Sequence, residues 1–304
     1  MGDGPVAAID CGTNTIKLLV GDLPDVAVRE LRMVRLGEDL DRTGRIADDA
    51  LARAFGAIEE YAALIAAHGV PPSRIRFCAT SASRDAANAD VFTAGVRERL
   101  GVEPEVVDGA EEAALSFDGA VRNLRVPPAP PVLVVDVGGG STELVLGTVA
   151  DGPRAVDSMD VGSVRLHERH LRSDPPTAAE VAACVADIDA HLDASPVDPG
   201  AAATVVGVSG TVTTVAAAVL DLPAYDRAAI DQAVLATDDV HAVVERLVAM
   251  SVAQRRALPW MHPGRADVVD AGALIWSRVL RRARVREVVV SESDILDAIA
   301  RSIG

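Results

Sequence analysis

The chain has 304 residues, of which 49% are apolar, 24% charged and 3% aromatic, so it can form a packed core and is not a disordered chain. Its net charge of −16 excludes the broad basic surface of a protein that binds duplex nucleic acid. Three widely spaced cysteines without a CxxC pair exclude a disulfide scaffold and a structural zinc site. At about 100–200 residues per domain, we expect one large domain or two medium-sized ones.

The beginning of the chain lacks the features of a signal peptide, since it has no basic region and carries Asp3 and Asp10 where such a peptide is apolar. Residues 201–220 carry no charge and could be mistaken for a membrane span. Their threonines and two glycines favour instead a buried strand, a glycine-containing turn and a buried helix. We therefore expect a cytoplasmic protein without a membrane span.

Strand-like and helix-like patterns alternate along the chain, which predicts an α/β architecture. Apolar residues at helical spacing from Leu51 to Ile65 predict a helix, which Gly69 terminates. The capping box of Thr177 and Glu180 opens a second helix, and Asp267–Arg282 predicts a third. The expected strands are Val6–Ile9, Ile16–Val20, Val132–Val135, Leu144–Leu146, Val205–Val208 and Val288–Val290.

A proline-rich segment, Val126–Pro131, interrupts this alternation with four prolines in five residues. Such a sequence can neither continue a helix nor join a central strand. We interpret it as a stiff linker between two domains, residues 1–127 and residues 128–304. As an alternative, the last helix of the chain packs on the first domain.

Two segments on either side of this linker repeat one pattern. Val6–Gly21 reads VAAIDCGTNTIKLLVG and Val132–Gly147 reads VLVVDVGGGSTELVLG. Both contain an apolar strand, an aspartate, a small polar turn, a second apolar strand and a closing glycine. Each alone is an ordinary β-hairpin. Together they predict two related α/β domains that face a shared cleft.

Three turns that follow apolar strands are rich in glycine and hydroxyl side chains: Gly12–Thr15, Gly138–Thr142 and Gly207–Thr211. Such turns leave backbone N–H groups open to a phosphate. None of them is a Walker A loop or a GxGxxG motif. The three turns together predict a site for a chain of phosphates.

Three carboxylates, Asp10, Asp136 and Glu143, stand at or just beyond these turns. Carboxylates repel bound phosphates unless a hard cation lies between them, which predicts Mg²⁺ held by one or two carboxylates and substrate oxygens. Asp10 and Asp136 would alternatively cap the turns through side-chain hydrogen bonds.

Two further acids, Glu111 and Glu112, stand at the beginning of a predicted helix. Acids in a first turn commonly interact with the helix dipole. One of the two is alternatively a general base that activates water against a phosphoryl group.

Eight short motifs follow one another over nearly the whole chain. They are IDCGTNTIKLLV (9–20), LGEDLDRTG (36–44), ATSASR (79–84), DGAEEA (108–113), VDVGGGSTE (135–143), GSVRL (162–166), SGT (209–211) and PGRAD (263–267). In this order they resemble the motifs of the Ppx/GppA family, the exopolyphosphatases and guanosine pentaphosphate phosphohydrolases of bacteria, which belongs to the sugar kinase/Hsp70/actin superfamily. The resemblance implies an α/β fold of two duplicated ribonuclease H-like domains with an interdomain cleft, in the short two-domain form.

The resemblance also implies roles for single residues. Glu112 resembles the catalytic base, and Asp136 and Glu143 resemble the carboxylates that organise the metal, with Asp10 as a third candidate ligand. The residues expected to contact phosphates are Asn14, Thr15, Arg84, Gly138, Gly139, Gly140, Ser141, Thr142, Ser209, Gly210, Thr211 and Arg265.

The expected activity is exopolyphosphatase: hydrolysis of the terminal phosphoanhydride of polyphosphate, assisted by Mg²⁺ or by Mn²⁺. Removal of the 5′-terminal phosphate from guanosine pentaphosphate, a stringent-response reaction, is the alternative within the same class. A regulator that binds nucleotide or polyphosphate without turnover, or more distantly a kinase of the superfamily, remains open. No duplex nucleic acid or membrane is expected as a partner, and a homodimer is compatible with these expectations.

The C-terminal segment Val290–Asp297, VSESDILD, departs from the arginine-containing SDRGLR pattern common in the family. Its acids Glu292, Asp294 and Asp297, with the net charge of −16, would repel the distal part of a long polyanion. The sequence therefore predicts a preference for short polyphosphate. The alternative is a track of arginines along one helix, formed by Arg278, Arg281 and Arg282.

Overall fold

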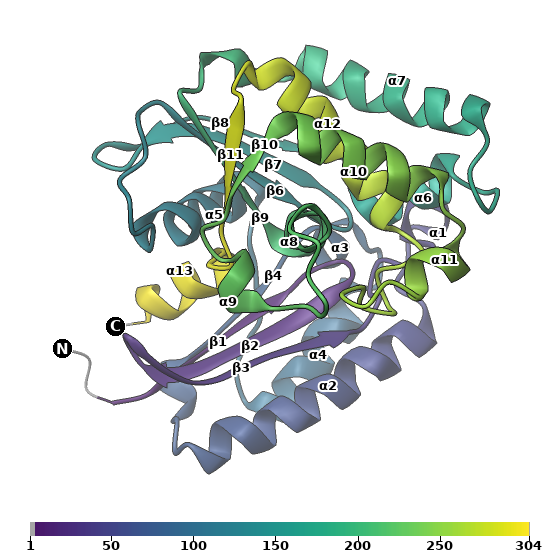
Figure 1. Ribbon diagram of the computed structural model, residues 1–304. Coiled ribbons are helices and arrows are strands. Elements are labelled where there is room, and N and C mark those ends of the chain that lie inside the picture. The colour runs from purple at the N-terminus through teal and green to yellow at the C-terminus, as the bar shows by residue number, and fades with distance from the viewer. Residues whose placement is uncertain (1–3, 304) are drawn as a thin grey trace. The chain divides into compact units, whose positions relative to one another are not determined.

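The computed structural model describes residues 4–303 (Figure 1). The chain forms two compact units: one comprises the residues up to Leu115 together with those from Ile295 onward, and the other runs from Ser116 to Asp294. The division lies within helix α5 (Gly109–Arg122), upstream of the proline-rich segment at which the sequence analysis places it. That segment belongs to the second unit, where the carbonyl of Ala129 accepts a hydrogen bond from Thr204.

The sheet of the first unit has five strands in the order β3-β2-β1-β4-β5. The first three strands form an antiparallel meander, and β1, β4 and β5 run parallel. Every residue of β1 is buried, as expected for a central strand covered on both faces. The bounds are β1 (Val6–Cys11), β2 (Thr15–Asp22), β3 (Asp25–Met33), β4 (Ile75–Ala79) and β5 (Glu105–Val106).

Helices cover both faces of this sheet. The long helix α2 packs beside α4 (Figure 1), and its buried residues recur at helical spacing from Leu51 to Ile65. α13 contributes Ile295, Leu296 and Ile299 to a separate cluster with Val6 of β1. The remaining bounds are α1 (Leu40–Thr43), α2 (Asp48–Ala67), η1 (Pro72–Arg74), α3 (Ser81–Asp85), α4 (Ala89–Leu100) and α13 (Ile295–Ser302).

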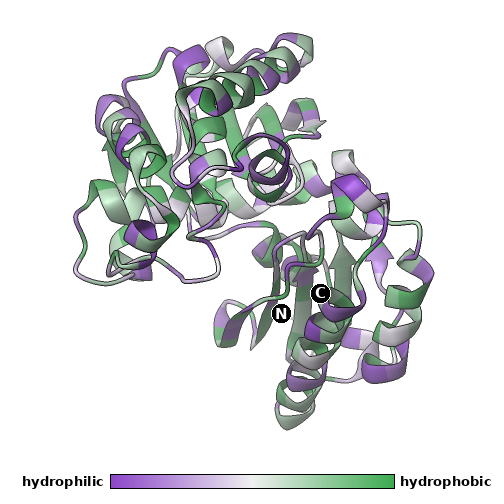
Figure 2. Ribbon diagram, turned by 90° about the vertical axis from the view of Figure 1, so that its right-hand side faces the viewer, coloured by the Kyte–Doolittle hydropathy of each residue, from purple (hydrophilic) through white to green (hydrophobic). Residues whose placement is uncertain are grey.

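The sheet of the second unit has six strands in the order β10-β11-β9-β6-β7-β8. Its strands β6, β7 and β8 again form an antiparallel meander, while β6, β9 and β11 run parallel. The strands of both sheets are predominantly hydrophobic (Figure 2). The bounds are β6 (Val132–Val137), β7 (Thr142–Thr148), β8 (Gly152–Met159), β9 (Thr204–Val208), β10 (Val234–Ala236) and β11 (Glu287–Val290).

Helix α12 is the central helix of the second unit and packs against α6, α7, α8 and α10. Nearly all of its residues are buried, and Trp276 and Ile275 belong to the core that includes Leu133 and Val135 of β6. The bounds are α6 (Ser163–His170), α7 (Ala178–Ala194), η2 (Pro199–Ala201), α8 (Ser209–Val219), α9 (Arg227–Ile230), α10 (Thr237–Ala249), α11 (Val252–Arg256) and α12 (Val269–Ala283).

The two repeated segments form equivalent hairpins, β1–β2 and β6–β7, each at the same position in its sheet. Asp10 lies opposite Lys17 in the first hairpin, and Asp136 lies opposite Glu143 in the second. Both sheets continue with the same meander and the same parallel strands, which is the duplicated ribonuclease H-like topology that the resemblance implies. The fold-class prediction is therefore confirmed.

The expected helices and strands are present as well. The capping box of Thr177 and Glu180 opens α7, and residues 201–220 form the end of η2, the strand β9 and the helix α8. Within residues 4–303, no helix combines the length and apolar character needed to cross a membrane. Five strands were not predicted from the sequence: β3, β4, β5, β8 and β10.

One buried ion pair ties α11 to α12 in the second unit. Nη1 of Arg255 lies 2.6 Å from Oδ2 of Asp270, and each side chain is 1% exposed. Burial alone would raise the pKa of Asp270, but the neighbouring His167, whose Nδ1 lies 3.4 Å from Oδ1, and the charge of Arg255 outweigh it, so the pKa is lowered. The carboxylate is thus held in its charged form as the partner of Arg255.

We expect Asp270→Ala to lower the free energy of unfolding by about 3–5 kcal/mol, because it leaves a buried arginine without its partner. Arg154→Ala serves as the control, since its pair with Asp151 is exposed at 58% and 64% and such pairs contribute at most ~1 kcal/mol. Urea unfolding of both variants measures the difference. Equal losses in the two variants would contradict this account of the core.

Candidate active site

Three loops of the first unit meet at one edge of its sheet, because β1, β4 and β5 run parallel and their carboxyl ends are adjacent. The N–H of Thr80 donates to Cys11, and the N–H of Val107 donates to Ala79, each over 3.1 Å. These bonds tie the loops to the strand ends. The first is the turn Gly12–Asn14, the second is Thr80 with the beginning of α3, and the third is Val107 and Asp108 with the beginning of α5.

The two acids at the beginning of α5 have different neighbours. Glu112 is 8% exposed, and its Oε2 lies 3.2 Å from Nη1 of Arg84. Glu111 is half-exposed and pairs with Arg76 over 2.9 Å. Arg84 also donates to the carbonyl of Val107 over 2.9 Å. The structure thus brings together two predicted site residues, Glu112 and Arg84, and turns Glu111 toward another arginine.

Asn14 and Thr15, two predicted phosphate contacts, lie where the first hairpin turns into β2. The carbonyl of Asn14 accepts hydrogen bonds from the N–H groups of Val34 and Arg35, each over 3.0 Å. In the same loop cluster, the hydroxyls of Thr13 and Ser81 are 2.8 Å apart. The turn is therefore fixed from two sides.

Asp10, the third metal candidate, has a cationic neighbour in this unit. Nζ of Lys17 lies 3.1 Å from Oδ2 of Asp10, and both side chains are largely buried. Lys17 is the only lysine of the chain. At the equivalent position of the second hairpin stands Glu143, so the two repeats differ here: the first forms an ion pair, and the second pairs two acids.

The glycine turn between β6 and β7 carries five of the predicted phosphate contacts, Gly138–Thr142. The carbonyls of Gly138 and Gly139 accept hydrogen bonds from the first N–H groups of α6, and Nε of Arg165 donates to the carbonyl of Gly140 over 2.8 Å. A Cβ at Gly162 would lie 2.4 Å from the carbonyl oxygen of Gly139. Only glycine lets α6 approach the turn this closely.

The second turn of this unit, Ser209–Thr211, begins helix α8. Since β6 and β9 are adjacent and parallel, it meets the glycine turn at the same edge of the sheet. Ser209 has a φ of 76°, a conformation that costs a non-glycine residue energy and is enriched at functional sites. The guanidinium of Arg265 lies against Gly210, where a Cβ would be 2.6 Å from its Cζ. Four predicted contacts therefore lie together in the second unit.

Asp136 and Glu143 are direct cross-strand partners on β6 and β7, so their side chains share one face of the sheet. Ser158 of β8 is the next partner in the row, and its hydroxyl donates to Oε1 of Glu143 over 2.8 Å. On the same face, Ser116 of α5 donates to Oδ2 of Asp136 over 2.8 Å. Two paired carboxylates are thus each held by a serine.

The donor set of this pair fits a hard divalent cation. Among residues 4–303, no three His, Cys, Asp or Glu side chains are grouped so that they could hold a metal by themselves. Mg²⁺ commonly takes only one or two protein carboxylates and completes its shell with water and substrate phosphates. Asp136 and Glu143, beside a phosphate-binding type of turn, meet that requirement.

The third loop of the second unit follows β11 and contains Glu292 and Asp294, two of the three acids of the C-terminal motif. Glu292 accepts a hydrogen bond from Tyr225 over 2.5 Å and lies 3.4 Å from Nε of Arg227. Burial raises the pKa of Glu292, although Tyr225 and Arg227 act in the opposite direction. In the first unit, Asp297 pairs with Arg29. Two of the three acids are therefore already paired with arginines of their own unit.

The alternative arginine track is also paired internally. Arg278 and Arg282 both contact Asp189, and Arg281 lies 3.9 Å from Glu245. These arginines connect α12 to α7 and α10, which accounts for their helical spacing without a ligand.

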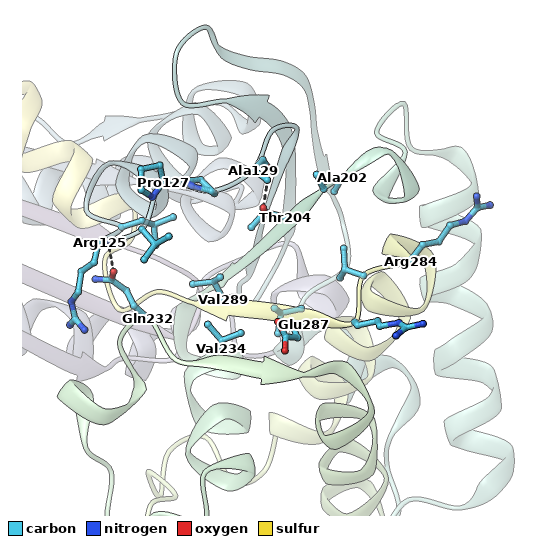
Figure 3. A pocket seen from close by; sticks show the side chains of 17 residues that line it. Arg125, Pro127, Ala129, Ala202, Thr204, Gln232, Val234, Arg284, Glu287 and Val289 are labelled. Atoms are coloured by element: carbon cyan, nitrogen blue, oxygen red, sulfur yellow. Dashed lines mark hydrogen bonds between the residues drawn. The ribbon is translucent and has the colours of Figure 1, made fainter.

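A groove of about 740 Å³ lies at the opposite end of the second unit's sheet, where β9 and β11 begin (Figure 3). The proline-rich segment forms part of its wall, and Val234 and Val289 lie side by side in it as cross-strand partners. None of the predicted site residues lines this groove. It is distinct from the candidate active site.

Sequence reasoning missed three residues of the site: Arg165, Ser116 and Ser158. Arg165 belongs to the GSVRL motif, so the sequence marks its position. The motif does not show that Arg165 contacts the glycine turn. Ser116 lies one helical turn after Glu112, and Ser158 lies in a strand that carries no apolar run. Their contacts depend on strand register and helix packing.

Comparison with known proteins identifies the family. Residues 17–295 match the model of the Ppx/GppA phosphatase family. The chain is 46% identical to Exopolyphosphatase 2 of Mycobacterium tuberculosis over 98% of both chains. The structure resembles that of an exopolyphosphatase-like protein with a TM-score of 0.94 and 44% identity, covering 99% of this chain and 98% of the other. It also resembles a Ppx/GppA protein of Aquifex aeolicus with a TM-score of 0.81 and 28% identity, covering 98% and 97%. The chain belongs to the Ppx/GppA phosphatase family.

Proposed function

We propose that the protein is an exopolyphosphatase, which hydrolyses the terminal phosphoanhydride of inorganic polyphosphate. The observation that carries this proposal is the 46% identity to Exopolyphosphatase 2 over 98% of both chains. The second unit has two turns of the kind that binds phosphate, Gly138–Thr142 and Ser209–Thr211, and a pair of facing carboxylates. These groups support the same chemistry. They are the groups that phosphoryl transfer requires, since its catalysis is largely positioning and electrostatic stabilisation.

In this proposal, Glu112 accepts the proton of the attacking water as general base. The bond between the terminal phosphorus and its bridging oxygen breaks, and that oxygen leaves with the shortened chain. Backbone N–H groups of the turns Gly138–Thr142 and Ser209–Thr211 bind non-bridging oxygens, except that of Gly138, which donates to the carbonyl of Ser141. Arg84 and Arg265 add positive charge, and Asn14 and Thr15 supply further polar contacts. Preorganised donors of this kind stabilise the charge that develops in the transition state.

Phosphatases of this family generally depend on a divalent metal. We propose Mg²⁺, with Mn²⁺ as a substitute, held by Asp136 and Glu143. When bound, the metal would neutralise negative charge of the substrate phosphates. Asp10 is the weaker candidate, because Lys17 already neutralises its carboxylate.

The proposal is tested by phosphate release from polyphosphate, guanosine pentaphosphate and ATP under identical conditions. We expect the highest kcat/KM on polyphosphate. Higher kcat/KM on guanosine pentaphosphate would favour the alternative hydrolase, and binding of polyphosphate without release would indicate a regulator. Transfer of phosphate to ADP would indicate a kinase-type reaction.

We expect a several-fold higher kcat/KM on chains of a few phosphates than on chains of several hundred, with low processivity. The arginines of α12 contact Asp189 and Glu245, and these acids weaken their attraction for a polyanion. The loop after β11 lies at the same sheet edge as the two turns, because β11, β9 and β6 run parallel. It adds the acids Glu292 and Asp294 there, of which Glu292 is paired with Arg227. Gel analysis of the products measures the preference.

The matched variant for this prediction is Glu292→Gln, which removes one negative charge and keeps the size of the side chain. It should shift the preference toward longer chains. Equal or higher kcat/KM of the unaltered protein on the long polymer, with processive products, would refute the short-chain preference.

A further inference from the structure

Two serine hydroxyls hold the two carboxylates to which the proposed metal site is assigned. Ser158 donates to Oε1 of Glu143, and Ser116 donates to Oδ2 of Asp136, both over 2.8 Å. The four residues lie within the second unit. A serine hydroxyl can donate one hydrogen bond, and in both cases a carboxylate oxygen accepts it.

The two serines reach the carboxylates from different elements. Ser158, Glu143 and Asp136 form one row across β8, β7 and β6, so Ser158 approaches along the sheet. Ser116 approaches from helix α5 above the same face. The carboxylate pair is therefore fixed from the sheet on one side and from a helix on the other.

Ser116 is a poor choice for packing alone. It is fully buried at 0% exposure in the interior of a helix, where serine has a lower helix propensity than alanine. A buried hydroxyl also costs free energy unless it forms a hydrogen bond. The hydrogen bond to Asp136 satisfies the buried hydroxyl of Ser116. A serine at this position is therefore explained by a role in orienting the carboxylate of Asp136.

We propose that Ser116 and Ser158 are positioning residues for metal binding by Asp136 and Glu143. This inference rests on the proposed function of that pair. Each hydroxyl engages one oxygen of its carboxylate and restricts the rotation of the group. Partners that orient metal ligands in this way typically change metal affinity by about 10–100-fold when removed.

The test measures Mn²⁺ binding directly, without substrate, by isothermal titration calorimetry and by electron paramagnetic resonance of free Mn²⁺. We expect Ser116→Ala and Ser158→Ala to raise the Kd for Mn²⁺ by about 10–100-fold. Ser158→Thr retains a hydroxyl in a strand that tolerates threonine, and it should restore affinity to near the original value.

The matched control is Ser277→Ala. Ser277 is a buried serine of the same unit, and its hydroxyl lies 2.8 Å from Nδ1 of His241 rather than from either carboxylate. This variant should bind Mn²⁺ as the original protein does. Thermal unfolding of each variant confirms that it is folded, and if Ser116→Ala does not fold, Ser158→Ala and Ser158→Thr still decide the question.

Failure of the inference is distinguishable from failure of the proposed function. Folded serine variants that bind Mn²⁺ as tightly as the original protein would overturn the positioning role while leaving the metal site in place. Absence of Mn²⁺ binding in the original protein would overturn the assignment of the metal to Asp136 and Glu143, and with it the inference.

Discussion

Glu112→Gln is expected to lower kcat by roughly 10²–10⁴-fold, the usual contribution of a positioned general base. The substitution keeps the size of the side chain and removes its capacity to accept a proton from water. Folding and KM should change little, since Gln retains an oxygen for the contact with Arg84. Steady-state phosphate release from polyphosphate, with thermal unfolding as a check on folding, measures the effect.

The matched control for this prediction is Glu111→Gln, the neighbouring acid in the same turn of α5. Its carboxylate is half-exposed and pairs with Arg76, away from Arg84. We expect a small loss, within a few-fold. Equal losses in the two variants, or a loss confined to Glu111→Gln, would show that the base has been assigned to the wrong glutamate.

Removal of divalent metal is expected to abolish activity, because the carboxylates of Asp136 and Glu143 would repel bound phosphates without a cation between them. Addition of Mg²⁺ or Mn²⁺ after chelation should restore it. Glu143→Ala should raise the metal concentration needed for half-maximal activity, since it removes one of the two proposed ligands. Titration of activity with Mg²⁺ after treatment with EDTA provides the measurement.

Lys17→Ala distinguishes the two repeats in the same experiment. Lys17 neutralises Asp10 in the first unit, so this variant should leave the apparent metal affinity nearly unchanged. Full activity in an excess of chelator would show that the proposed metal chemistry is wrong.

The duplicated architecture could be predicted because its signal is local and repeated. The segments around Asp10 and Asp136 carry an apolar strand, a turn and a second strand in the same order, and each forms the same hairpin in its own sheet. Capping boxes and helical spacing likewise depend on residues close in sequence, as in α7, which begins after Thr177.

The strands that escaped prediction lack such a signal. β3 (Asp25–Met33) and β8 (Gly152–Met159) lie at sheet edges and are partly exposed, so they carry charged residues instead of an apolar run. β5 has only two residues, Glu105 and Val106. Their pairing is fixed by neighbouring strands.

The candidate site divides in the same way. Motif spacing identified Glu112, Asp136 and Glu143, but it could not show which neighbours hold them. The contact of Ser116 with Asp136 depends on how α5 packs, and the ion pair of Asp10 with Lys17 depends on cross-strand register. Both are tertiary properties of the chain.

Hydrolysis of a short polyphosphate in ¹⁸O-labelled water tests the central claim most directly. In the proposed reaction, water attacks the terminal phosphorus and the bridging oxygen stays with the shortened chain. Mass spectrometry should therefore find one solvent oxygen in each released orthophosphate and none in the chain, which shortens by one phosphate at a time. Label in the remaining chain, internal cleavage, or transfer of unlabelled phosphate to added ADP would contradict the account.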